Sequence, residues 1–243
     1  MGPDFYGLLR RRFMEILEEK GVMDEHLEVV SAWTLNAEDA IGRPERNDYP
    51  LLKGKEVMIE ANFRGAKGQA FTDTPGGFDG ILRDVTEFPL TNNFQKALFI
   101  ASLNAVMRYF GLIDGTIHCK DKEPGLCAKR FVEVIRERFG APKIAFIGFQ
   151  PAMIEELSRA FQIRVLDLDK ENIGKEKFNL IIEGPERQDG VLSWCDIILA
   201  TGSSCVNSTI TDFIKTKPVI FYGVSVAGAA KILELNRYCP YSH

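Results

Sequence analysis

The chain has 243 residues, of which 45% are hydrophobic and 26% charged, and its formal net charge is −4. This composition is ordinary for a globular protein, and the length is sufficient to bury a sizeable core. The acidic balance, with no basic run beyond Arg10–Arg12, argues against nucleic acid as a partner. No stretch approaches the roughly 20 apolar residues of a membrane span, so we expect a cytoplasmic protein with reduced cysteines.

The first part of the chain, residues 1–113, is predicted to form a small α+β domain. Apolar residues at three- and four-residue spacing indicate helices, and β-rich runs next to glycine turns indicate an antiparallel hairpin. In chain order, the expected elements are a helix over 4–20, strands over 27–34, 57–63 and 69–72, and a helix over 92–110.

The second part, residues 124–243, shows a different pattern. A helix is predicted over 128–139, and five short apolar runs then alternate with helical or loop segments; the runs are 143–149, 163–168, 180–182, 197–200 and 219–222. Continuous apolar runs are typical of parallel strands that are buried on both faces. The fold class is therefore α/β, with a Rossmann-like, mostly parallel sheet and a domain boundary between Ile113 and Pro124.

Ligands of such sheets bind beyond the carboxyl ends of the strands, so the residues that follow each strand are the first candidates for a site. Gly148 follows the first strand, but Phe149 and Pro151 replace the glycines that a dinucleotide fingerprint needs. Ordinary tight NAD binding is therefore not expected. Asp167 and Asp169 follow the second strand. Their carboxylates are placed to accept hydrogen bonds from a ribose diol. The alternative is that they are only solvent-exposed groups at the end of the strand.

The fourth strand runs into a cluster of small polar residues, which are Thr201, Gly202, Ser203, Ser204 and Asn207. If a helix begins here, its unpaired N–H groups and its dipole favour an anion. The alternative is simple capping of the helix by a hydroxyl group. The cluster exceeds what one cap needs, so we expect it to take part in ligand binding.

Two further residues near the strand ends have chemistry of their own. Cys205 is predicted in the first turn of that helix, where the pKa of a thiol is lowered. It is a reactive thiolate, a ligand or a packing residue. Ser225 follows the fifth strand and is a candidate ligand residue, but the segment lacks the second glycine of a nucleophile elbow. Only His243 follows Ser225 in the chain, which argues against a hydrolase triad.

The remaining candidates are thiols and an imidazole. His118, Cys119 and Cys127 precede the predicted sheet, and Cys239 lies near the end of the chain. Thiolates and imidazole are ligands for zinc, copper(I) or iron, so a transition metal, zinc or iron, is the expected cofactor if these residues form a site. The spacing matches no standard zinc motif, and Cys239 meets the other residues only if the C-terminal segment folds back toward Cys119 and Cys127. Ordinary reduced cysteines are the alternative.

Several segments resemble a domain-of-unknown-function family that is described as "putative heavy-metal chelation". They are Asp196–Gly202 with Val206–Thr209, Ala227–Ala230 with Arg237–Pro240, and the His118-Cys119 pair with Cys127. The resemblance implies an N-terminal domain like the small domain of enolases, followed by a Rossmann-like domain. Members often carry glycine after the Val-Asn pair and no cysteine before it. This chain has Ser208 and Cys205 there, so its ligand set is expected to differ.

The leading functional prediction is a binding protein for a metal, a metal chelate or an anionic small molecule at the carboxyl edge of the sheet. The alternative is an enzyme, a transferase or lyase acting on a nucleotide-like or pterin-like substrate, with Asp167 or Asp169 on its ribose. A third hypothesis is a non-catalytic subunit or scaffold. The sequence leaves the oligomeric state open, a homo-oligomer included, and indicates neither nucleic acid nor a membrane as partner.

Overall fold

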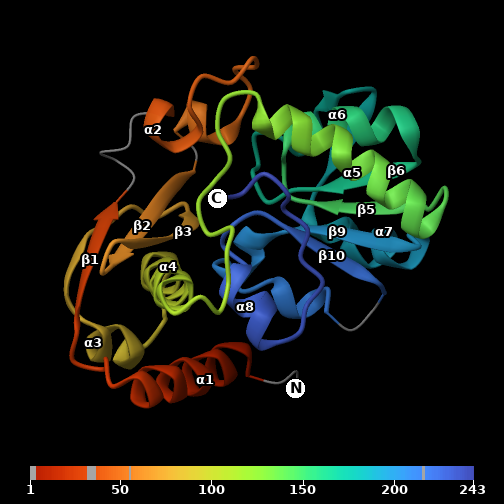
Figure 1. Cartoon of the computed structure of the whole chain (residues 1–243). Helices are drawn as coiled ribbons and strands as arrows, with labels where there is room; N and C mark the ends of the chain where they lie inside the picture. Colours follow the sequence, from red (N-terminus) through yellow and green to blue (C-terminus); the bar gives the residue numbers. More distant parts are fainter. Residues whose placement is uncertain (1–3, 32–36, 55, 215–216) are drawn as a thin grey trace.

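The computed structural model describes residues 4–31, 37–54, 56–214 and 217–243. Figure 1 shows a small sheet on one side and a larger sheet on the other, with the long helix α4 between them. Within the described ranges, no helix is both long enough and apolar enough to cross a membrane.

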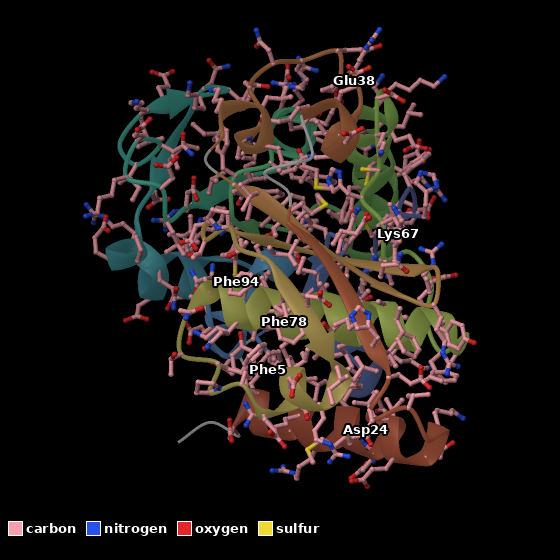
Figure 2. All side chains as sticks on the ribbon, turned by 90° about the vertical axis from the view of Figure 1, so that its left-hand side faces the viewer. Phe5, Asp24, Glu38, Lys67, Phe78 and Phe94 are labelled. Atoms are coloured by element: carbon pink, nitrogen blue, oxygen red, sulfur yellow. The ribbon has the colours of Figure 1, made fainter. Side chains whose placement is uncertain are left out.

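The small sheet is antiparallel and has the strand order β3-β2-β1-β4. Its elements, with the surrounding helices, are α1 (Phe5–Lys20), β1 (His26–Ser31), α2 (Ala37–Ile41), η1 (Pro50–Lys53), β2 (Val57–Phe63), β3 (Ala66–Thr72), β4 (Phe78–Ile81), α3 (Leu82–Glu87) and α4 (Asn93–Tyr109). The predicted first helix, hairpin and last helix are confirmed. Residues 32–34 of the predicted first strand lie outside the described residues. In Figure 2 the small sheet faces the viewer, with Phe78 labelled on β4 and α4 behind it.

Helix α1 shows how directly the sequence sets these elements. The Asp4 side chain accepts a hydrogen bond from the backbone N–H of Gly7 at 2.9 Å and caps the start of the helix. Gly21 ends it with φ +65°, a left-handed conformation that suits glycine. The side chains of Leu9, Phe13 and Leu17 are fully buried, so the four-residue apolar spacing becomes the packed face of the helix.

The large sheet has six strands in the order β10-β9-β5-β6-β8-β7, and all are parallel except β7. Its elements are α5 (Glu123–Phe139), β5 (Ile144–Ile147), α6 (Pro151–Ala160), β6 (Ile163–Leu166), β7 (Glu176–Lys177), β8 (Leu180–Glu183), η2 (Pro185–Arg187), α7 (Gln188–Trp194), β9 (Ile197–Thr201), η3 (Gly202–Cys205), η4 (Ile210–Asp212), β10 (Val219–Tyr222) and α8 (Ala227–Ile232). Each of the five predicted apolar runs overlaps one of the five parallel strands, and β8 and β9 each extend one residue beyond the predicted run. The predicted Rossmann-like α/β fold is confirmed.

Both faces of the large sheet are buried, but against different layers. On β5, Ile144 and Phe146 pack into the core under α5 and α6. The alternating residues Ala145 and Ile147 pack into a second core, which includes α4 and the small sheet. Figure 1 shows these layers on opposite sides of the sheet. Because the second core is shared by both parts of the chain, the division into 1–113 and 124–243 stays a prediction.

Strand β3 is held close to the large sheet at the junction of the two parts. A Cβ atom on Gly68 would lie only 2.3 Å from the Ala101 carbonyl oxygen, so glycine permits the close approach of β3 to α4. The backbone N–H of Phe71 donates to the Ser225 hydroxyl at 3.0 Å. These contacts bring the end of β3 to the carboxyl edge of the large sheet.

Candidate functional site

A cavity of about 550 Å³ lies at the carboxyl ends of β5, β6, β9 and β10. Its floor lies where β5 pairs with β6 on one side and with β9 on the other. The chain order reverses at this point, which is the usual ligand position in open α/β sheets. The other walls come from the first part of the chain, including Tyr49–Leu51, Glu56 and Phe71–Asp73. The cavity therefore lies between the sheet edge and the N-terminal elements.

Most of the residues predicted from the sequence meet in this cavity. Its lining includes the predicted ligand residues Gly148, Asp167, Asp169, Thr201, Ser203 and Asn207. It also includes all four predicted metal ligands, His118, Cys119, Cys127 and Cys239. Three predicted ligand residues, Gly202, Ser204 and Ser225, are buried beside the cavity and are not part of its described lining.

The predicted anion cradle differs from the structure. The helix expected after β9 is only the four-residue 3-10 helix η3. The Thr201 hydroxyl accepts from the Ser203 N–H at 3.3 Å, and the Ser204 hydroxyl donates to the Thr201 carbonyl at 2.7 Å. Asn207 Oδ1 accepts from both the N–H and the hydroxyl of Thr209, at 3.1 and 2.7 Å. The polar atoms are therefore engaged with one another, and the prediction of a regular helix N-terminus was wrong.

The expected effect of that helix on Cys205 was wrong for the same reason. Cys205 is fully buried, and its burial raises the pKa of the thiol instead of lowering it. The residue packs in the core, and its carbonyl accepts a hydrogen bond from the Tyr6 hydroxyl. Ser225 likewise has a structural contact, since its hydroxyl accepts from Phe71. A Cβ atom on Gly202 would lie 3.0 Å from the Val226 nitrogen, so glycine permits the close packing of this segment, and a ligand role for Gly202 stays a prediction.

Carboxylates dominate the charged groups of the cavity. The described lining contains Glu56, Asp73, Asp167, Asp169 and Glu171, and its described residues include no lysine or arginine. Burial and the negative charges of Asp167, Asp169 and Asp73 raise the pKa of Glu56 to about 7. Burial also raises the pKa of Asp167, although the Asn172 amide donates to it at 2.7 Å. Like charges therefore crowd one end of the cavity.

Tyr222 and Gly148 form the floor beneath these carboxylates. The Tyr222 hydroxyl donates to the Ile147 carbonyl at 3.0 Å, and its ring stacks on Phe146 at 5.3 Å. Burial and the charges of nearby carboxylates raise the pKa of this phenol. Gly148 has φ +93°, and a Cβ atom there would lie 2.8 Å from Thr201 Cγ2. Glycine thus lets β5 and β9 end side by side.

The thiols lie on another wall of the cavity. The pKa of Cys119 and of Cys127 is raised, first by burial and then by the neighbouring thiols, among them Cys239. The three cysteines therefore lie near one another. They meet because the tail folds back: the backbone of His243 pairs with that of Ile117 at 2.8 and 3.0 Å. Figure 1 shows the C-terminus beside the segment that precedes α5.

His118 lies on the same wall. Burial lowers the pKa of its imidazole to about 4, so the ring is neutral at physiological pH. The ring packs edge-on against Phe71 at 5.2 Å, and the buried Nδ1 atom has no hydrogen-bond partner among the described residues. A neutral imidazole with an unpaired nitrogen is chemically suited to metal binding.

The donor types thus suit a soft metal ion, but their arrangement does not form a ready site. Within the part of the chain that the structure describes, no group of three or more His, Cys, Asp or Glu side chains is placed to hold one ion. Structural metal sites usually have four protein ligands in fixed positions. The set His118, Cys119, Cys127 and Cys239 stays a prediction, and a bare ion held by three of these residues does not fit the structure.

Glu56, Asp73 and Tyr222 line the cavity but were not among the residues predicted from the sequence. Glu56 immediately precedes the strand predicted over 57–63, and Asp73 immediately follows the one predicted over 69–72. These positions at strand ends were a usable signal. Glu56 and Asp73 flank antiparallel strands, to which the rule for parallel strand ends does not apply, and Tyr222 is the last residue of an apolar strand.

Fold and cavity together define an α/β protein with a ligand-sized cavity at the switch point of a Rossmann-like sheet. A profile of the DUF364 family, which is described as "Putative heavy-metal chelation", matches residues 131–234. The resemblance stated from the sequence is confirmed to that extent, and the enolase-like N-terminal domain stays a prediction. No curated protein matches this chain.

Two solved structures have a similar fold. One is a DUF364-family protein of unknown function from Pyrococcus horikoshii, with 18% identity and a TM-score of 0.56, and the similarity covers 91% of this chain and 79% of that one. The other is a DUF364-family protein of unknown function from Desulfitobacterium hafniense, with 12% identity and a TM-score of 0.54, covering 93% and 82% of the two chains. At these identities the likeness shows the fold alone.

Proposed function

We propose that this protein binds a small molecule in the cavity at the carboxyl edge of the large sheet. The observation that carries the proposal is the cavity itself, whose volume of about 550 Å³ lies at the switch point. Small-molecule sites typically measure roughly 300 to 1,000 Å³ and combine an apolar lining with a few polar groups. Apolar side chains such as Phe149, Met153 and Leu168 line this cavity beside the carboxylates.

The charge of the lining favours a cationic or metal-bearing molecule over an anionic one. Glu56 and Asp167 already have raised pKa values in the free protein, so a negatively charged ligand would add to the repulsion. The description of the related family as heavy-metal chelation points in the same direction. Since no three His, Cys, Asp or Glu side chains of the described residues are placed to hold a bare ion, we propose that a metal is bound together with an organic molecule that supplies further donors.

In this proposal the thiol wall completes the coordination. Cys119, Cys127 and Cys239 offer soft sulfur donors, and His118 offers a neutral imidazole. A bound metal would favour the thiolate forms and thereby offset the raised pKa of the buried thiols. The protein's own part is to exclude water from one side of the ligand and to present sulfur to it.

The test is the composition of protein purified without oxygen or chelator. We expect a transition metal and an organic molecule to be released together on denaturation, measured by elemental analysis and mass spectrometry. Cys119→Ala should lower the metal content by at least about tenfold. Cys195→Ala is the matched control, because Cys195 is also buried but is not part of the described lining. Protein that holds neither metal nor small molecule, even after reconstitution, would contradict the proposal.

One observation favours an enzyme as the second candidate. A carboxyl group whose pKa lies near 7, such as that of Glu56, is suited to general acid–base catalysis. The predicted transferase or lyase acting on a nucleotide-like or pterin-like substrate is tested by a thermal-shift panel of such compounds. Ligand at 100 times its dissociation constant stabilises a protein by about 2.7 kcal/mol. A panel without any shift would leave this candidate without support.

A further inference from the structure

We propose that the acidic end of the cavity binds an organic cation, an ammonium or guanidinium group of the small molecule, between Glu56 and Asp167, and that binding releases a proton from Glu56. The inference rests on the proposed function and names the chemical class of its ligand. When the cation binds, the neutral carboxyl group of Glu56 gives its proton to solvent, and the resulting carboxylate pairs with the cation. Charge is thereby conserved.

The carboxylates come from separate elements and meet only in the folded cavity. Glu56 directly precedes β2, Asp73 follows β3, and Asp167 follows β6. All three line the cavity. Glu56 is half-buried, and it makes no hydrogen bond or ion pair with any other residue that the structure describes. A carboxyl group without a partner at the wall of a cavity is a polar group that a ligand can satisfy.

Among the described residues, the titratable groups that face Glu56 are all acidic. They are Asp167, Asp169, Asp73 and the phenol of Tyr222. The neighbours have partners of their own: Asp167 accepts from Asn172 at 2.7 Å, and Asp73 accepts from Asn93 at 2.9 Å. Asp169 accepts from the Glu171 N–H at 2.8 Å and has a further partner. Glu56 is therefore the carboxyl that is left to meet a positive ligand group.

The cavity is better suited to an organic cation than to a bare metal ion. Its volume of about 550 Å³ is far larger than an ion requires, and no described trio of side chains is placed to coordinate one. Apolar side chains, including Phe71, Phe149 and Met153, line the remaining space. A ligand with a cationic group at one end and an apolar body fits this division of the lining.

The test uses the full chain and defined probes. Putrescine and agmatine carry the proposed groups, and 1,4-butanediol is an uncharged analogue of the same length as putrescine. In calorimetry at pH 7 we expect the amines to bind and the diol not to bind. We further expect the heat to vary with the ionisation enthalpy of the buffer, which reports proton release. Affinity for the amines should rise from pH 6 to pH 8.

Glu56→Gln should weaken amine binding by at least about tenfold and remove the buffer dependence of the heat. The matched control is Glu137→Gln, an exposed carboxylate on α5 that is outside the described cavity lining. Circular dichroism checks that both variants are folded.

Each outcome separates this inference from the proposed function. If the purified protein holds a metal-bearing or neutral molecule but neither amine binds, the inference is overturned and the proposed function stands. If amines bind without proton release, or equally well to Glu56→Gln, the assignment of Glu56 is wrong. If no small molecule or metal is held at all, both proposals fail.

Discussion

Replacing Glu56 by glutamine is expected to stabilise the protein at pH 8 by about 2–3 kcal/mol more than at pH 5. In the folded protein, burial and nearby acids raise the pKa of Glu56 from 4.5 to about 7. Between these values the unfolded chain loses the proton while the folded chain keeps it. The unfolded state then binds fewer protons, so the free energy of unfolding falls as the pH rises from 4.5 to 7. Glutamine cannot ionise, and the variant escapes this loss.

Urea unfolding of both proteins at pH 5 and pH 8 measures the effect. Glu137→Gln serves again as the control, because an exposed carboxylate should change the stability little at either pH. A Glu56 variant that is no more stable than the wild type at pH 8 would show that the carboxyl is already matched by a positive group. Glu56 lies in the proposed ligand site, and residues at functional sites often lower the stability of the folded protein.

The fold was largely predictable because its signals are local. The four-residue apolar spacing of α1 and its caps at Asp4 and Gly21 lie within one stretch of sequence. The strands of the large sheet are short apolar runs, since both faces of the sheet are buried. Strand β4 and helix α3 were not predicted. Each is only a few residues long, and Gly80 interrupts the pattern of β4.

The candidate site was predictable only in part because it is assembled from distant segments. The rule that ligands bind at the carboxyl ends of parallel strands located Asp167 and Thr201 correctly at the cavity. The same rule could not locate Glu56, which directly precedes strand β2 of the other sheet and lines the cavity only after the two sheets have packed together. The burial of Cys205 was equally hidden, because a hydroxyl-rich turn of the 3-10 type has the same residues as a helix cap.

One buried side chain, Asn104 on α4, makes hydrogen bonds to elements of both parts of the chain. Its amide nitrogen donates to the carbonyl groups of Gln69 and Val224, each at 3.1 Å. Its oxygen accepts from the backbone N–H of Gly228 at 2.8 Å. Asn104 is fully buried, so these backbone groups have no water to replace it. One side chain thus joins α4 to β3, to the segment after β10 and to α8.

Asn104→Leu is therefore expected to destabilise the protein by about 3–5 kcal/mol, because each buried backbone group left unpaired costs about 1–3 kcal/mol. Leucine has a similar size, which keeps the loss of packing small and isolates the loss of hydrogen bonds. The control is Ser102→Ala on the same helix, since the buried Ser102 hydroxyl donates to the Leu98 carbonyl of its own helix at 2.7 Å and has no other partner among the described residues. It should cost about 1 kcal/mol or less.

Chemical denaturation of the two variants and the wild type measures the difference. Loss of the Asn104 hydrogen bonds should also loosen one wall of the cavity, because β3 contributes Phe71 and Thr72 to this wall and leads into Asp73. Hydrogen exchange in the segment 69–73 is therefore expected to rise in Asn104→Leu and to stay unchanged in Ser102→Ala. Equal stability of the two variants would mean that the packing around α4, and not the hydrogen bonds of Asn104, holds the small sheet against the large one.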